Sequence, residues 1–305
     1  MGRRVVSLLP STTEIVAALG HGDALVGRSH ECDFPPEVAD LPVISRPRRE
    51  PVGTSGAIHR GVVELLEQVL SVYEVDPDGL RAADPDLIIT QDLCRVCAVP
   101  EDDVMTAVRA HLGTEVEVLT SSPMTLDAVL ADVVRIGEAL DDAAAADGLA
   151  ARMRAGWDEL AASVAGLDRP RLALLEWADP LIAGGNWAPE LAEIAGADAV
   201  LGIRGGHSPV VSPEALTEAD PDVILVAPCG YDLARTLQER EVLARIPGWQ
   251  DLSAVRAGRV ACADGSAFFN RPGPRLVTSA AIITAVVHGI GPAMDLEGRT
   301  WQRWT

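Results

Sequence analysis

The sequence has few aromatic residues, few positive charges and no long apolar run. Phe, Trp and Tyr make up 4% of its 305 residues. It contains 25 Lys and Arg residues against 45 Asp and Glu residues, which gives a formal net charge of −20. Such a surface repels a phosphate backbone, which argues against nucleic acid as a partner. Because no apolar stretch approaches about 20 residues, we expect no transmembrane segment.

The N-terminus lacks the pattern of a signal peptide. Its apolar run, 5–9, is shorter than a signal core and is followed at once by Pro10 and polar residues. The 5 cysteines are odd in number, which argues against a complete disulfide framework and favours a reducing compartment. As the sequence stands we expect a cytoplasmic protein with no signal peptide or lipobox, or an extracytoplasmic protein from which a leader has been removed.

Motifs of common enzyme classes are also missing. The sequence has no glycine-rich phosphate loop of the required spacing, and residues 53–56 lack the strand–turn–helix context of a nucleophile elbow. Carboxylates such as Glu14 and Asp33 are not accompanied by a base or an electrophile in the sequence. We therefore expect no catalytic residues and no enzymatic activity.

The sequence does contain a rough copy of one of its own elements. Residues 14–27 read EIVAALGHGDALVG, and residues 191–202 read LAEIAGADAVLG. Residues 83–89, ADPDLII, are echoed at 219–225 by ADPDVIL. The length and the hydrophobic content of 48% suit two domains. Two lobes of like construction that face each other predict a cleft for a small ligand.

Apolar runs between turn signals predict short buried strands that alternate with helices. Strands are expected over residues 4–9, 25–27, 87–90, 116–119, 171–177, 223–226 and 259–263. Helices are expected over residues 11–19, 61–70, 186–196 and 276–287. The first of these helices is predicted to begin with a capping box, in which Ser11 is the cap and Glu14 its partner. Residues 45–61 are expected to form a flexible loop.

The longest helix-forming stretch lies in the middle of the chain. Apolar residues keep helical spacing over 125–164, and no proline interrupts them. We predict one long helix, or two nearly continuous ones, that links two lobes. The predicted organisation is an N-terminal α/β lobe over 1–122, a linking helix over 123–168 and a C-terminal α/β lobe over 169–305. Both lobes are expected to be Rossmann-like, with mostly parallel sheets.

In this order the segments resemble the helical-backbone metal receptor superfamily, which comprises the class III substrate-binding proteins of ABC importers for cobalamin, haem and ferric siderophores. The matching segments are residues 6–14, 25–29, 33–36, 84–88 and 268–275. The pattern is most similar to that of the cobalamin-binding proteins. The resemblance implies two α/β lobes joined by a long helix, a corrinoid, iron chelate or other metal chelate held between them, and an ABC permease as partner.

The resemblance, together with places after predicted strands, at helix starts and in the loop 264–275, suggests which residues contact the ligand. The expected ligand-binding residues are Pro10, Ser11, Thr12, Glu31, Gln91, Asp92, Trp187, Tyr231, Phe268, Phe269 and Arg271. For Trp187 a place in the core, and for Arg271 support of its own loop, are equal alternatives. Gln91 and Glu31 stand where the best-known members have Trp and Tyr, whereas Phe268 keeps an aromatic residue at a third such position. A flat tetrapyrrole favours apolar and aromatic walls, so this cleft is expected to be more polar than that of the cobalamin binders.

Two cysteine-containing segments are candidates for a metal site. Cys94 and Cys97 form a Cys-x-x-Cys pair after the strand predicted at 87–90, and His30 and Cys32 follow the strand predicted at 25–27. Because ligands gather at the carboxyl ends of parallel strands, these thiols and this imidazole are positioned to bind a soft or borderline metal ion. The alternative is ordinary buried cysteine, since a single Cys-x-x-Cys pair is common.

The leading hypothesis is therefore a non-enzymatic receptor of an ABC-type importer that needs no obligatory cofactor. Its ligand is expected to be a corrinoid or a metal chelate, or else a soft metal ion. A second hypothesis is a cytosolic protein that handles a metal chelate or cofactor, with a site at Cys32, Cys94 and Cys97 and no transporter. A third is an enzyme of the related nitrogenase-component-like fold, which only the thiol cluster favours.

Overall fold

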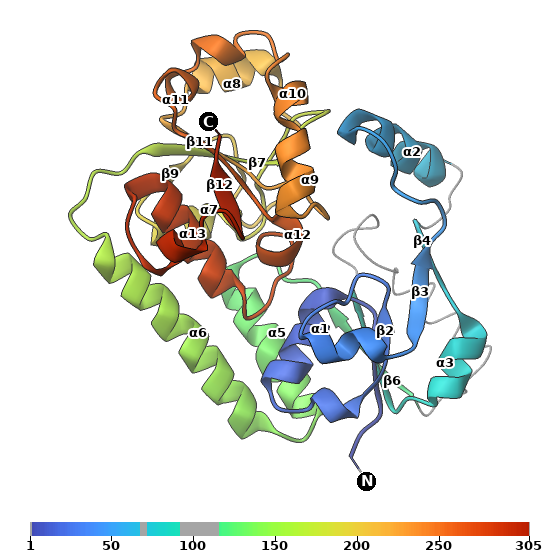
Figure 1. Cartoon of the computed structure of the whole chain (residues 1–305). Helices are drawn as coiled ribbons and strands as arrows, with labels where there is room; N and C mark the ends of the chain where they lie inside the picture. The colour runs from blue at the N-terminus through green and yellow to red at the C-terminus, as the bar shows by residue number, and fades with distance from the viewer. Residues whose placement is uncertain (1, 68–71, 92–115, 305) are drawn as a thin grey trace. The chain divides into compact units, whose positions relative to one another are not determined.

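Two compact units make up the chain, and each contains one copy of the repeated sequence. The computed structural model describes residues 2–67, 72–91 and 116–304 (Figure 1). The N-terminal unit comprises Met1–Val52, Arg60–Pro123 and Asp127–Ala151. The C-terminal unit comprises Gly53–His59, Met124–Leu126 and Arg152–Thr305. The expectation of an α/β fold with two mostly parallel sheets is confirmed.

The N-terminal unit is built on a 6-stranded sheet in the order β4-β3-β2-β1-β5-β6. Its strands are β1 (Val5–Ser7), β2 (Leu25–Ser29), β3 (Val43–Pro47), β4 (Tyr73–Val75), β5 (Leu87–Gln91) and β6 (Glu117–Ser121). Its helices are α1 (Pro10–Ala18), α3 (Pro77–Ala83), most of α5 (Leu126–Ala139) and the 3-10 helices η1 (Gly22–Ala24) and η2 (Pro36–Asp40). In this spatial order the neighbouring strands β3, β2, β1, β5 and β6 all pair in parallel. The edge strand β4 pairs antiparallel with β3.

The C-terminal unit has a second sheet in the order β12-β11-β10-β7-β8, with β9 paired to β7. Its strands are β7 (Arg171–Trp177), β8 (Ile182–Ala183), β9 (Asp198–Ala199), β10 (Val223–Val226), β11 (Val260–Ala263) and β12 (Trp301–Arg303). Its helices are α7 (Ala188–Ile194), α8 (Pro213–Ala219), α9 (Leu233–Gln238), α10 (Arg240–Leu243), α11 (Ser253–Arg256), α12 (Gly265–Phe268), α13 (Leu276–His288), η3 (Trp249–Asp251) and η4 (Pro292–Leu296). Strands β7, β10 and β11 are parallel, whereas β8 and β12 are antiparallel to their neighbours.

The Ala-Asp-Pro-Asp echo forms the same turn in both units. Helices α3 and α8 end just before Asp84 and Asp220, which adopt left-handed backbone conformations with φ of 44° and 35°. Two residues later, the Asp86 carboxylate accepts a hydrogen bond from the Arg4 backbone N–H at 2.9 Å. The Asp222 carboxylate accepts one from Arg171 in the same way, at 2.8 Å. Each aspartate therefore joins the start of one parallel strand to the start of the next.

The other echo is a helix that ends at a glycine. Gly20, after α1, has φ of +88°, and Gly196, after α7, has φ of +72°. This left-handed conformation favours glycine because it has no Cβ. In each case the following short strand, β2 or β9, pairs in parallel with the first strand of its unit. The repeat is thus a strand–helix–strand element present once in each sheet.

The central helical stretch consists of two helices. Helix α5 ends at Ala139, and α6 (Ala143–Ser163) begins after a turn in which Asp141 adopts φ of 59°. The boundary between the two units falls within α6, which has 21 residues. Of the two predicted forms, a single helix or two, the structure has the second. Among the helices of the described residues, none is both long and apolar enough to cross a membrane.

Two local predictions are wrong. Helix α1 begins at Pro10, not after a Ser11 cap, and its cap residue Leu9 makes no side-chain capping bond. Proline suits this first position because its missing N–H would have no partner inside the helix. The loop expected at 45–61 contains part of β3 and the start of α2 (Ser55–Glu67). Its arginines and glycines suggested a loop, although the strand and the helix start were present within it.

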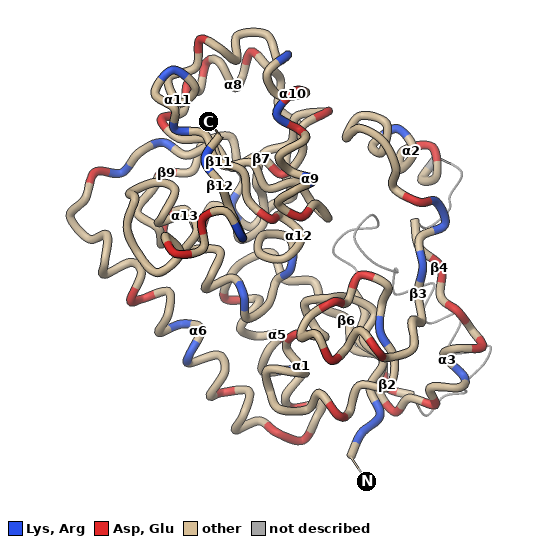
Figure 2. The backbone as a smooth tube through the Cα atoms, viewed as in Figure 1, with Lys and Arg blue, Asp and Glu red and all other residues tan. Residues whose placement is uncertain are grey.

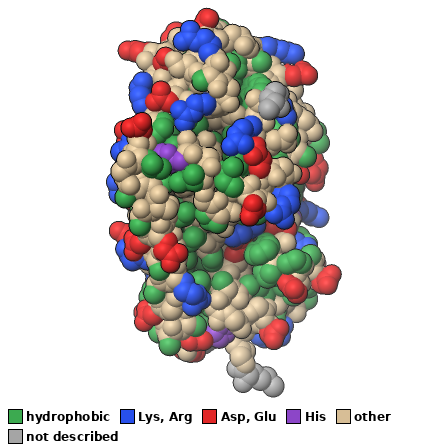
Figure 3. Space-filling view, turned by 60° about the vertical axis from the view of Figure 1, so that its left-hand side comes forward, with side chains coloured by type: hydrophobic (Ala, Val, Ile, Leu, Met, Phe, Trp, Pro, Cys, Tyr) green, Lys and Arg blue, Asp and Glu red, His purple; other side chains and the backbone are tan. Residues whose placement is uncertain are grey.

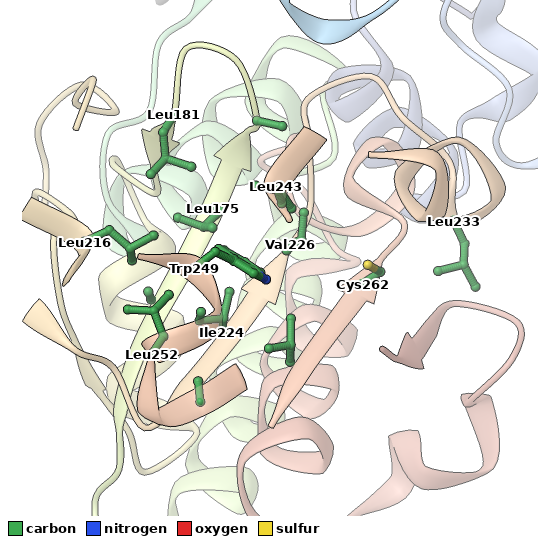
Figure 4. Packing of buried hydrophobic residues seen from close by; sticks show 14 residues of the cluster. Leu175, Leu181, Leu216, Ile224, Val226, Leu233, Leu243, Trp249, Leu252 and Cys262 are labelled. Atoms are coloured by element: carbon green, nitrogen blue, oxygen red, sulfur yellow. The ribbon is translucent and has the colours of Figure 1, made fainter. Parts of the chain in front are cut away.

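Each unit has its own apolar core. In the C-terminal unit, Trp249 packs among Leu175, Ile224, Leu243 and Leu252, over the strands β7 and β10 (Figure 4). The Trp249 side chain is 2% exposed. In the N-terminal unit the core cluster includes Val6, Leu8, Ile44, Leu80 and Ile88. Val6, Ile44 and Ile88 come from β1, β3 and β5, and Leu80 comes from α3, so this cluster packs the helix against the sheet.

The turn between α5 and α6 yields a stability prediction. A Cβ added at Gly137 would lie 2.3 Å from the Cβ of Ala146 and 3.1 Å from the backbone oxygen of Asp142. Gly137→Ala should therefore lower the free energy of unfolding by about 2 kcal/mol, because neither neighbour can move aside without shifting a helix. Denaturant unfolding measures this change. The double variant Gly137→Ala/Ala146→Gly should recover part of it.

Gly22→Ala is the control for this prediction, since no atom lies within 4 Å of the added Cβ. Its free energy of unfolding should stay close to that of the unchanged chain. If Gly137→Ala behaved like Gly22→Ala, the close approach of the two helices would be refuted.

Candidate functional site

Buried hydroxyl groups gather where β1 leads into α1. Ser7 Oγ lies 2.7 Å from Thr12 Oγ1 and accepts a hydrogen bond from Thr13 Oγ1 at 2.8 Å. Thr13 Oγ1 also donates to Cys32 Sγ at 3.0 Å, so the buried Cys32 thiol belongs to this network. Ser11 Oγ is buried and has no hydrogen-bond partner among the described residues. Leaving such a hydroxyl unsatisfied is unfavourable, and an external polar group would relieve it.

His30, Glu31 and Tyr73 come together beside β3. The rings of His30 and Tyr73 have centroids 5.1 Å apart, and the Tyr73 hydroxyl donates to Glu31 Oε1 at 3.4 Å. His30 Nδ1 lies 3.4 Å from Ser45 Oγ. Burial lowers the pKa of His30, which favours the neutral imidazole, the form that binds metals. Imidazole, carboxylate and phenol thus share one small area of the N-terminal unit.

The predicted thiol site is not tested by the structure. Asp92, Cys94 and Cys97 lie outside the described residues. Gln91, which precedes them, is 7% exposed at the end of β5. Among residues 2–67, 72–91 and 116–304, no three His, Cys, Asp or Glu side chains are grouped so that they could hold a metal ion. Metal binding at Cys32, Cys94, Cys97 and His30 stays a prediction.

In the C-terminal unit, an arginine and two aromatic rings stack where β7 and β10 end. The rings of Trp177 and Tyr231 have centroids 5.1 Å apart. The Arg235 guanidinium lies 4.3 Å from the centre of the Tyr231 ring and donates to its hydroxyl at 3.2 Å. Tyr231 is 7% exposed, whereas Trp177 is half-buried. Tyr231 is therefore a buried support, and the accessible part of this cluster is formed by Trp177 and Arg235.

The loop after β11 adds a second arginine–aromatic pair. The Arg275 guanidinium lies 5.4 Å from the ring centre of Phe268, which is half-buried. Phe269 is 2% exposed, and its backbone oxygen accepts a hydrogen bond from Trp187 Nε1 at 3.2 Å. Of the two adjacent phenylalanines, Phe269 is therefore enclosed and Phe268 keeps an accessible part of its ring. Trp187 is 5% exposed and so has little surface for a ligand.

Arg271 lies in the same loop and is almost enclosed. It is 6% exposed, and its Nη2 donates to Ser266 Oγ at 3.2 Å. Burial raises the pKa of Asp264, and the charges of Arg271 and Arg275 oppose this shift. The Ser266 N–H donates to the Tyr231 backbone oxygen at 3.0 Å, which connects the loops after β10 and β11. This hydrogen bond therefore joins the segment that carries the Arg235–Tyr231 contact to the segment that carries the Arg275–Phe268 contact.

Glu176 is the most perturbed carboxyl group of this region. It accepts a hydrogen bond from Ser208 Oγ at 2.5 Å, and Ser208 Oγ in turn accepts one from the Gly185 N–H at 3.1 Å. Burial raises the pKa of Glu176 to about 7, even though the hydrogen bonds from Ser208 and Gly185 oppose the shift. Glu176 precedes Trp177 at the end of β7, next to the arginine–aromatic pairs.

Sequence reasoning missed Glu176, Arg235 and Tyr73. A signal for Glu176 was present, because a carboxylate stands at the carboxyl end of the otherwise apolar strand 171–177. No such signal marked Arg235, which faces Tyr231 one helical turn away, or Tyr73, whose neighbours come from distant parts of the sequence.

Comparisons with known proteins agree with this arrangement of strands and loops. The model of a family described as periplasmic binding protein matches residues 5–267. The chain is 25% identical over 288 residues to the vitamin B12-binding protein of Vibrio parahaemolyticus serotype O3:K6 (strain RIMD 2210633), covering 93% of this chain and 88% of that protein.

Similar solved structures cover nearly the whole chain. The periplasmic heme-binding protein RhuT from Roseiflexus sp. RS-1 has a TM-score of 0.69 and 25% identity, covering 94% of this chain and 98% of that one. The periplasmic vitamin B12-binding protein BtuF of Vibrio cholerae has a TM-score of 0.66 and 20% identity, covering 93% and 96%. A possible iron-binding protein of Staphylococcus epidermidis ATCC 12228 has a TM-score of 0.71 and 19% identity, covering 94% and 99%.

The raised pKa of Glu176 predicts a pH dependence of stability. Because the folded-state pKa of about 7 lies above the ordinary 4.5, the folded chain holds more protons in this window than the unfolded chain. The contribution of Glu176 to stability is therefore lost as the pH rises from about 4.5 to about 7. Glu176→Gln should remove this dependence and raise the free energy of unfolding at pH 8 by about 2 kcal/mol. Denaturant unfolding across this pH range measures both effects.

Glu214→Gln is the control of opposite sign. Glu214 is exposed, and hydrogen bonds from its own backbone N–H and from Ser212 lower its pKa. The contribution of Glu214 to stability is present above its ordinary pKa and is lost as the pH falls. Glu214→Gln should therefore not gain stability at pH 8. An unchanged pH profile in Glu176→Gln would contradict the account of Glu176.

Proposed function

Because this chain belongs to the periplasmic binding protein family and has the class III fold, we propose that it is the substrate-binding component of an ABC-type importer. Its ligand is a cobalamin-like corrinoid or a ferric or other metal chelate. Relatives named for vitamin B12, heme and iron support this class of ligand. The protein is a receptor that binds and releases its ligand unchanged, and no catalytic step is assigned to it.

The observation that carries the proposal is the pair of arginine–aromatic contacts in the C-terminal unit. Arg235 lies over the ring of Tyr231, which contacts Trp177 at the end of β7. Arg275 lies over the ring of Phe268, in the segment that follows β11. Half-buried aromatic rings offer a flat apolar surface, and arginine forms paired hydrogen bonds with carboxylate or phosphate groups. A ring-shaped chelate with acidic substituents has both features. We call Trp177, Arg235, Phe268 and Arg275 the aromatic–arginine face.

The N-terminal unit supports the same class of ligand with more polar groups. His30, Glu31 and Tyr73 form one cluster, and the Ser11 hydroxyl lies unsatisfied at the start of α1. These groups can bond to the amide, hydroxyl or carboxylate substituents around a metal chelate. The departures from the cobalamin binders at Glu31 and Gln91 fit a ligand with a more polar edge than cobalamin.

We propose an ABC permease as the partner, and a site of action outside the cytoplasmic membrane. Relatives described as periplasmic support this location. Asp and Glu residues recur along the backbone of both units (Figure 2), and acidic side chains are scattered over the face shown in Figure 3. Exposed carboxylates of this kind can pair with basic residues of a permease.

Ligand binding tests the proposal. Cyanocobalamin, haemin and a ferric siderophore should be added separately, and at least one should raise the melting temperature in proportion to its concentration, as mass action requires. For that ligand, Trp177→Ala and Phe268→Ala should each weaken binding about tenfold, or roughly 1.4 kcal/mol, because each removes an aromatic wall. Calorimetric titration measures the affinities.

Ile290→Ala is the matched control, since Ile290 is an apolar side chain of the same unit that is 39% exposed and follows the C-terminal end of α13, whereas Arg275 precedes the N-terminal end of that helix. It should bind the ligand as the unchanged chain does. A chain that binds none of these ligands would refute the proposed ligand class. Binding that survives both aromatic substitutions would refute the proposed face.

A further inference from the structure

A short segment from the first fifth of the sequence is built into the C-terminal unit. Residues Gly53–His59 belong to that unit, whereas the residues on either side belong to the N-terminal unit. We call Gly53–His59 the clip. Ser55 is completely buried, although Val52 immediately before the clip is 77% exposed. The clip is therefore held by contacts of its own residues, because Val52, which precedes it, buries little apolar surface.

Two polar contacts fasten the clip to α9 and the residue after it. Ser55 Oγ donates to Glu239 Oε2 at 2.7 Å, and both side chains are buried. Arg235 Nη2 donates to the Gly53 backbone oxygen at 2.9 Å. Arg235 Nη1 and Glu239 Oε1 form an ion pair at 2.8 Å, so the two anchors belong to one network. A hydrogen bond to a buried carboxylate is stronger than one between neutral groups.

The local sequence leaves Ser55 free for this contact. Thr54 accepts the Ile58 N–H through its backbone oxygen, and its hydroxyl accepts the Ala57 N–H at 3.3 Å, so Thr54 caps α2. Gly53 has φ of +106°, a conformation that a residue with a side chain rarely adopts. The clip thus begins with a glycine turn and a threonine cap, which direct the next hydroxyl to Glu239.

Arg235 connects the clip to the aromatic–arginine face. The same guanidinium that binds the Gly53 oxygen also covers the Tyr231 ring and donates to the Tyr231 hydroxyl. Tyr231 supports Trp177. A ligand that contacts Arg235 therefore acts on a side chain that also fastens the clip.

We propose that the clip is a gate beside the aromatic–arginine face, closed by the Ser55–Glu239 and Gly53–Arg235 contacts, which sets how fast ligand enters and leaves. This inference rests on the proposed function, since it concerns the same face. Weakening the clip increases the rates of association and dissociation together and changes the equilibrium affinity less than either rate. A purely structural segment would alter stability without this paired change of rates.

The first test needs no ligand. Arg49 and Arg60 are exposed and flank the clip, so trypsin can release the peptide 50–60 when the clip detaches. Ser55→Ala should release it about tenfold faster than the unchanged chain, in line with the loss of one hydrogen bond to a charged group. Ser55→Thr keeps a hydroxyl and should cleave at a rate nearer the original. Equal release from Ser55→Ala and the unchanged chain would overturn the proposal.

Ser121→Ala is the matched control, because Ser121 is a buried serine that donates to a buried carboxylate, Asp132, at 2.6 Å in the other unit. It should lose a similar amount of stability, measured by its melting temperature, without faster release of the peptide 50–60. If this variant released the peptide as fast as Ser55→Ala, cleavage would report general loosening, and the proposal would fail.

The second test uses stopped-flow binding of cyanocobalamin or haemin, whichever the unchanged chain binds. Ser55→Ala should raise the association and dissociation rate constants by a similar factor, several-fold each. A change in the dissociation rate constant alone would overturn the gate. Unchanged rate constants in a variant that releases the peptide 50–60 faster would also overturn it. A chain that binds only the ferric siderophore is tested in the same way with that compound. A chain that binds none of the three compounds refutes the proposed function and the gate with it, and the trypsin result then still shows whether the clip is held by Ser55.

Discussion

The parallel alignment of strands within each sheet is the constraint on which the other features depend. In both units, an aspartate at the start of one strand accepts the backbone N–H of its neighbour, Asp86 from Arg4 and Asp222 from Arg171. With the strand starts held together, the carboxyl ends also meet at one edge, because the strands run in the same direction. The loops that leave this edge are therefore brought together, although they are far apart in the sequence.

In the C-terminal unit, this edge combines burial with charge. The apolar strands around Ile224 and Trp249 fill the core, and the polar side chains begin where those strands end. Glu176 is the clearest case, since burial at the end of an apolar strand raises its pKa to about 7. Arg235 forms an ion pair with the buried Glu239 carboxylate and lies over the Tyr231 ring, which in turn contacts Trp177.

Much of the fold could be predicted from the sequence, because apolar periodicity and turn residues act locally. The strands at 171–177 and 223–226 were predicted with the bounds that the structure has, and the Ala-Asp-Pro-Asp echo marked equivalent turns. The capping box at Ser11 was wrong because a proline one position earlier already starts the helix. The segment 45–61 was misread because its strand pairs with residues distant in sequence.

The candidate site was less predictable, because it depends on side chains that meet only after folding. Phe268 was found through a family resemblance and Tyr231 through its place after a predicted strand, whereas Arg235, Tyr73 and Glu176 were identified only by their partners in space. Whether Trp187 or Phe269 contacts a ligand stays a prediction, and both are nearly enclosed. The part of the site expected at Asp92, Cys94 and Cys97 lies outside the described residues.

Native mass spectrometry most directly tests the claim that the protein is a receptor for a metal chelate. The intact protein would be incubated with an equimolar mixture of cyanocobalamin, haemin, a ferric siderophore, a disaccharide and a tripeptide. The account predicts a complex with one of the three metal-containing compounds, which elemental analysis would show to contain cobalt or iron. A complex with the disaccharide or the tripeptide, or an intact protein with no bound compound, would contradict it.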